Sequence, residues 1–88
     1  MANIRSQIKR NRQNVKRHDR NQAVRSEVKT RTRHAVEAAE AGADNVEELT
    51  NVALRRIDEA ATKGVLHKNT AARRKSRLVR QVARLQAD

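Results

Sequence analysis

The sequence predicts an all-α protein, a three-helix bundle with a long basic N-terminal helix that projects from it as an arm. The 88 residues contain no proline and only two glycines, Gly42 and Gly64, so the residues that most often interrupt helices occur just twice. Between and after these glycines, apolar side chains recur at spacings of three and four, which is typical of amphipathic helices. Three helical segments follow from these observations.

The first helix is predicted over residues 4–41, because Gly42 can adopt the left-handed conformation that ends a helix. At about 100° per residue, its apolar side chains fall on two opposite sides. The N-terminal set is Ile4, Ile8 and Val15, and the C-terminal set is Val24, Val28, Ala35 and Ala39. Since no single neighbour can bury both sets, we expect one domain in which residues 24–88 form the bundle and residues 1–23 form the projecting arm.

The second helix is predicted to begin at Asp44, with Glu47 completing a capping box, and to end near residue 63 before Gly64. The third is predicted over residues 69–87. Each has one apolar face that can pack against the other helix. These faces consist of Val46, Leu49, Ala53, Ile57 and Ala60 in the second helix, and of Ala71, Leu78, Val82 and Leu85 in the third.

The charge of the chain indicates a polyanionic partner. The net charge is +11 and the pI is about 11.6, while only 17 residues are Ile, Val or Leu and none is aromatic. This composition lies near that of disordered chains, so the protein is expected to need a partner to fold fully. Residues 1–36 carry +9, residues 37–62 carry −5 and residues 63–88 carry +7, which places a basic helix on either side of an acidic one. Nucleic acid is the first candidate and an anionic membrane surface the second.

Cations recur at helical spacing in both basic segments. The arm stripe consists of Arg5, Lys9, Arg12, Lys16 and Arg20, widened by Arg10 and Arg17, and Arg25 follows it. The C-terminal stripe consists of Arg73, Arg77, Arg80 and Arg84, on the side of the third helix away from its apolar face. Solvated helix faces usually mix charges of both signs, so an uninterrupted stripe favours the binding of phosphates.

The residue types narrow the kind of nucleic-acid binding. Without Phe, Tyr or Trp, the modules that stack single-stranded bases on aromatic rings are excluded, which leaves recognition of shape and backbone. Asn and Gln side chains between the arm cations can bind sugars, phosphates or bases, or can serve only as polar residues that a helix tolerates; the sequence fits both. A basic zipper is disfavoured because it requires several unbroken heptads after its basic region, and Gly42 interrupts them. An interfacial membrane helix would need a wider apolar face than Ile4, Ile8 and Val15 offer.

Catalysis and metal binding are not expected. His18, His34 and His67 lack cysteine partners and metal-ligand spacing, although His34 and Glu37 share a helix face. Two glycines do not make a phosphate-binding loop, and no serine lies in a nucleophile elbow. We therefore expect no cofactor and no small-molecule substrate. The absence of cysteine, of a leader and of a membrane-length apolar run indicates a soluble intracellular protein.

The segment KGVLHKNTAARRKSRL (residues 63–78), with the opening MANI and the central AAEAGA, resembles the bacterial small-subunit ribosomal protein S20 family over essentially the whole chain. The resemblance implies a three-helix bundle with a long first helix, a cytoplasmic location in the ribosome, and direct binding of small-subunit ribosomal RNA, with other small-subunit components as possible partners. It also implies two contact regions. These are Asn3, Ser6, Lys9, Arg12 and Lys16 in the arm, and His67, Lys68, Asn69, Arg73 and Arg74 after the second glycine.

The predicted function is that of a structural subunit that neutralises clustered phosphates of packed ribosomal RNA helices. The alternative is a general nucleoid-type or double-stranded nucleic-acid-binding protein, for which the same cation stripes would serve. Charge periodicity by itself does not separate RNA from DNA.

Overall fold

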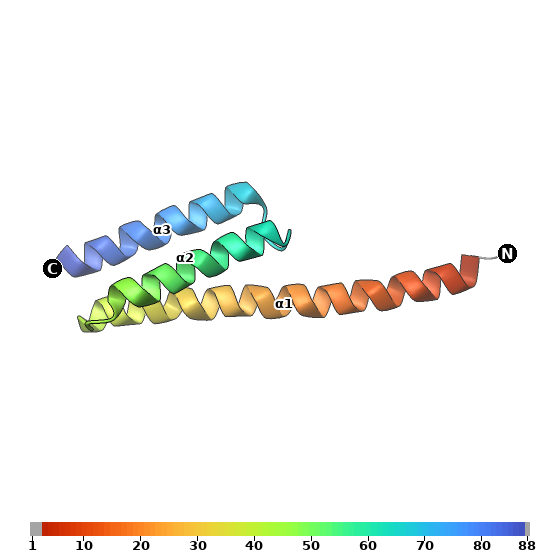
Figure 1. Cartoon of the computed structure of the whole chain (residues 1–88), viewed down its shortest axis with the longest axis horizontal. Helices are drawn as coiled ribbons and strands as arrows, with labels where there is room; N and C mark the ends of the chain where they lie inside the picture. Colours follow the sequence, from red (N-terminus) through yellow and green to blue (C-terminus); the bar gives the residue numbers. More distant parts are fainter. Residues whose placement is uncertain (1–2, 88) are drawn as a thin grey trace.

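The computed structural model describes residues 3–87, which form three α-helices: α1 (Asn3–Ala41), α2 (Val46–Thr62) and α3 (Lys68–Ala87). Helices α2 and α3 lie beside the C-terminal half of α1, and the N-terminal half of α1 extends past them alone (Figure 1). The molecule is therefore elongated, with extents of 66 × 21 × 14 Å. The predicted fold class, a helical bundle with a long arm, is confirmed.

Both glycines end helices as the sequence predicts. Gly42 and Gly64 have positive φ angles of 66° and 79°. After α1, the amide of Ala43 donates to the carbonyl of Ala38 at 3.0 Å, and after α2 the amide of Val65 donates to the carbonyl of Ala60 at 2.9 Å. These are the hydrogen bonds of Schellman motifs, which satisfy carbonyls that a helix end would otherwise leave free.

The predicted capping box of α2 is wrong. The N-cap residue is Asn45, whose carbonyl accepts the amide of Leu49 at 3.0 Å, and no side chain caps the helix. Val46 is 3% exposed and packs in the core, which fixes the first helical residue and leaves Asp44 one position too early to cap it. Glu47 and Glu48 still lie in the first turn, where their charges favour the N-terminal end of the helix dipole.

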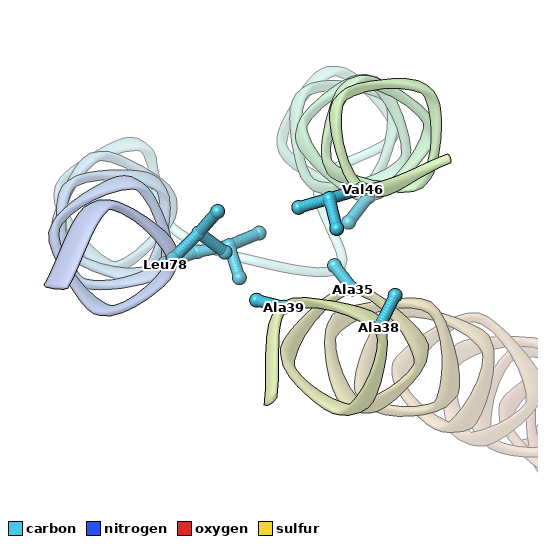
Figure 2. Close-up of a cluster of buried hydrophobic side chains, with 7 residues drawn as sticks. Ala35, Ala38, Ala39, Val46 and Leu78 are labelled. Carbon is cyan, nitrogen blue, oxygen red and sulfur yellow. The ribbon is translucent and has the colours of Figure 1, made fainter. Parts of the chain in front are cut away.

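The core near the C-terminal end of α1 is built from small side chains. Figure 2 shows alanines of α1 pointing into the space between Val46 of α2 and Leu78 of α3. Because alanine occupies little volume, the three backbones can approach closely and still exclude water. The buried residues of this cluster are Ala35, Ala38, Ala39, Val46, Ala53, Leu78 and Val82.

A second cluster lies toward the turn between α2 and α3. It contains Val28, Ile57, Ala60, Val65, Leu66 and Ala71. Val65 and Leu66, each 7% exposed, lie between the helices and were not among the predicted core residues. They follow Gly64 directly and pack in the same cluster as Val28 of α1, so the α2–α3 turn covers this end of the core.

The arm receives no cover from the rest of the chain. Every residue from 4 to 20 is exposed, and partial burial first appears at residue 21. Ile4, Ile8 and Val15 are 63%, 48% and 60% exposed, whereas Val28 is 2% exposed. The predicted change of apolar face therefore corresponds to the point where α1 leaves its neighbours.

Substituting Leu78→Ala should lower the free energy of unfolding by about 2–5 kcal/mol, because Leu78 is 1% exposed where all three helices meet. Urea denaturation followed by circular dichroism measures this change. The matched control is Val79→Ala on the adjacent, 47% exposed position, which should change stability by less than about 1 kcal/mol. Equal losses in the two variants would contradict the core described above.

In the free protein, amide hydrogens of residues 4–20 should exchange nearly as fast as in an unfolded peptide, and those of residues 46–60 should be strongly protected. The reason is that a helix without tertiary burial is only marginally stable. Hydrogen exchange read by mass spectrometry or NMR measures both segments at once. Equal protection along all of α1 would mean that the arm is stable without a partner.

Candidate nucleic-acid interface

The arm stripe lies on the part of α1 beyond the bundle. All five of its cations are exposed, as are Arg10 and Arg17, which widen it. Within residues 3–87, no carboxylate pairs with any of these seven side chains, because Asp19, the acid inside the arm, lies 3.8 Å from His18 instead. The arm therefore presents a continuous positive surface with no internal counter-ion.

The C-terminal stripe forms a second positive surface, on the exposed side of α3. The Nε groups of Arg73 and Arg80 donate to the carbonyls of Asn69 and Ser76, at 3.4 Å and 3.3 Å. Each contact uses one of five guanidinium donors, so the others stay available for a phosphate. Arg74 is exposed beside this stripe.

The other predicted contact residues lie on the same two helices as these surfaces. Ser6 and Arg25 are exposed on α1, and Lys68 and Asn69 are exposed in the first turn of α3. Asn3 begins α1, but its side chain lies outside the described residues. The predicted residues thus fall into two separate groups, one along α1 and one at and within α3.

His67 has a structural role that the sequence interpretation missed. Its Nδ1 accepts the backbone amide of Asn69 at 3.1 Å, which satisfies one of the free amides at the start of α3. In neutral imidazole the nitrogen that accepts a hydrogen bond carries no proton, so the proton is on Nε2, which can still donate. The one feature of the sequence that could have indicated this capping role is the position of His67 just before the predicted third helix, although histidine is not a common N-cap residue.

Ion pairs neutralise four of the cations that lie outside the predicted interface. Arg56 of α2 lies 3.1 Å from Glu27 of α1 and 3.0 Å from Glu59, and Lys75 of α3 lies 2.7 Å from Asp58 of α2. Arg31 and Arg33 pair along α1, at 4.0 Å and 3.6 Å, with Glu27 and Glu37. None of these four cations belongs to the predicted site. The carboxylates therefore neutralise the cations at and near the helix contacts.

One hollow of the surface is unsuited to phosphate. It measures about 800 Å³ at the start of α2, and its lining includes the carboxylates of Asp44, Glu47 and Glu48 with Arg55 as its one cation. A smaller groove between α1 and α3 has the opposite character, with Lys29, Arg74 and Arg77 in its lining. Lys29 was missed because its proximity to α3 depends on how the two helices pack, which the cation periodicity does not encode.

The structure offers little for the other chemistries considered. Within residues 3–87, no three His, Cys, Asp or Glu side chains gather as metal ligands would. The carboxylate of Glu37 lies 3.6 Å from Arg33, which makes it part of an ion pair rather than a base for His34. Across the same residues, none of the helices has the length and apolar character needed to cross a membrane.

The family model and the similar proteins found by comparison all name the same ribosomal protein. A family model described as ribosomal protein S20 matches residues 2–83. The small ribosomal subunit protein bS20 of Nocardioides sp. is 56% identical, covering 97% of this chain and all of the relative. The proteins of the same name from Salinispora tropica and Streptomyces griseus are each 53% identical, covering 99% of this chain and all of each relative.

Substituting His67→Ala should lower the stability of the free protein by about 1 kcal/mol, because the substitution removes the acceptor for the Asn69 amide. Thermal unfolding without RNA measures this effect, and His18→Ala on the exposed arm is the control, with no expected change. If the two variants unfold at the same temperature, the cap contributes nothing to the fold.

Proposed function

Because the chain belongs to the ribosomal protein S20 family, we propose that its two cation stripes are the surfaces through which it binds small-subunit ribosomal RNA. As a member of that family, the protein is a structural constituent of the small ribosomal subunit and is located in the ribosome of the cytoplasm. The family is one of structural ribosomal proteins and is not known for enzymes. Other components of the small subunit are further possible partners.

The observation that carries this proposal is the absence of protein cover over the arm. Residues 4–20 are all exposed, and within the described residues their cations lack carboxylate partners. A helix of this length without tertiary contacts is marginal, so the arm needs a ligand to be stable. Closely spaced RNA phosphates supply both the missing counter-ions and the missing contact surface.

The proposed contact residues fall into the two groups that the structure separates. The first group, on α1, contains Asn3, Arg5, Ser6, Lys9, Arg10, Arg12, Lys16, Arg17 and Arg20 of the arm and Arg25 just after it, and the second group contains His67, Lys68, Asn69, Arg73, Arg74, Arg77, Arg80 and Arg84. We divide the chain functionally at the same place, with residues 1–23 as the RNA-dependent arm and residues 24–88 as the bundle. The acidic start of α2 would face away from the RNA.

The protein should bind small-subunit ribosomal RNA with a steep salt dependence, since each duplex phosphate contact contributes about −0.9 to the slope of log affinity against log salt. The variant Arg12→Gln, Lys16→Gln should lose roughly 0.9 of slope per lost contact. The matched control is Arg33→Gln, Arg55→Gln, which removes the same charge outside both stripes. Titration at several salt concentrations gives the three slopes.

A wild-type slope near zero would contradict phosphate neutralisation, and equal losses in the two variants would show that only net charge matters. Competition between ribosomal RNA and duplex DNA at fixed salt tests the alternative of a general duplex-binding protein. Equal competition by the DNA would favour that alternative.

A further inference from the structure

A groove of about 430 Å³ lies between α1 and α3 and shares Arg77 with the C-terminal stripe. Its floor includes the buried Leu78 and the half-buried Thr32, and its cations are exposed. The α1 side of the lining is Lys29 and Thr32, and the α3 side is Arg74, Arg77, Leu78 and Gln81. The groove therefore combines three positive charges with a hydroxyl and an amide, and no carboxylate.

The spacing of these residues allows them to converge on one ligand. Lys29 and Thr32 are three residues apart on α1, and Arg74 and Arg77 are three residues apart on α3, so each pair occupies one face of its helix. Arginine presents a planar set of donors that matches two oxygens of one phosphate, and lysine adds a mobile point charge. Cations on opposite walls of one groove can thus bind the same anion.

The contacts between helices show what this groove lacks. Each ion pair that joins two helices within residues 3–87 involves α2: Arg56 with Glu27 of α1, and Asp58 with Lys75 of α3. Among the same residues, neither an ion pair nor a side-chain hydrogen bond joins α1 to α3. Within these residues, the direct side-chain contacts between α1 and α3 are therefore apolar, and cations of both helices line the groove between them.

We propose that this groove binds a single phosphodiester of the RNA backbone and that the bound phosphate clamps α3 against α1. The proposal rests on the function proposed above and adds to it Lys29, Thr32 and Gln81, which no cation stripe contains. The ligand is the sugar–phosphate backbone, because the lining offers cations and small polar groups and no ring on which a base could stack. When RNA binds, its phosphate then serves as a counter-ion for Lys29 of α1 and for Arg74 and Arg77 of α3, and the repulsion between these cations is removed.

The experiment is a double-mutant cycle of Lys29→Gln and Arg77→Gln, with affinity measured on full-length small-subunit ribosomal RNA. Each single substitution should weaken binding about tenfold at low salt. The double variant should weaken it much less than the hundredfold product, because both side chains contact one phosphate. The control pair Arg33→Gln, Arg55→Gln should reduce affinity less than either single substitution.

Stability of the free protein provides the readout that a purely structural role would change. All of these variants should unfold at or above the wild-type temperature, since the substitutions remove repulsion from exposed positions. In the RNA complex, the wild type should protect the Leu78 amide more strongly from hydrogen exchange than the double variant does.

Three results would overturn the proposal. They are undiminished affinity of the double variant, multiplicative losses in the cycle, and a lowered unfolding temperature that accounts for the loss of binding. Each of these results can occur while the wild type still binds RNA with a steep salt dependence. The groove proposal can therefore be wrong while the proposed function is right. A wild type that does not bind RNA would overturn both.

Because the chain has no cysteine, a second measurement can locate the RNA directly. A hydroxyl-radical probe attached through Gln81→Cys at the groove should cut the RNA backbone, whereas one attached through Asn51→Cys at the acidic hollow should not. Equal cutting from the two positions would contradict an RNA strand in the groove.

Discussion

The packing of small side chains where α1, α2 and α3 meet is the constraint on which the rest of the structure depends. Alanines such as Ala35 and Ala53, both fully buried, let the backbones come close enough to exclude water with few large residues. Because the large core residues are few, only the C-terminal half of α1 is buried against α2 and α3. On the N-terminal side of Val24, α2 and α3 no longer lie beside α1 and residues 4–20 are all exposed, so the arm must be stabilised from outside.

Charge is arranged around that core in two ways. Glu27 of α1 pairs with Arg56 of α2, and Asp58 of α2 pairs with Lys75 of α3, so these two carboxylates act as counter-ions at the contacts of α2 with its neighbours. Partly exposed ion pairs of this kind contribute little stability singly, and their main effect here is to leave the arm, the C-terminal stripe and the α1–α3 groove as the positive surfaces. A polyanion approaching the molecule therefore finds its attractive surfaces away from the acidic start of α2.

The number, lengths and buried faces of the helices could be predicted because they depend on local signals in the sequence. These signals are the glycines at 42 and 64, which adopt the positive φ angles that end helices, and apolar residues at helical spacing. The cap of α2 could not be predicted, because the burial of Val46 rather than the preference of Asp44 sets the start of that helix. The arm stripe was visible in one helix, whereas the groove at Lys29 requires residues of two helices whose relative rotation no local pattern specifies. Local chemistry thus predicted the surfaces on single helices, and tertiary packing determined the rest.

The uninterrupted course of α1 has a mechanical consequence. Its 39 residues contain neither proline nor glycine and, once ordered, span about 58 Å from end to end. A continuous helix bends only gently, so the arm and the bundle become the two ends of one strut. When both ends hold RNA, the distance between the RNA elements is set by the number of residues in this helix, and the protein acts as a ruler within the assembled particle.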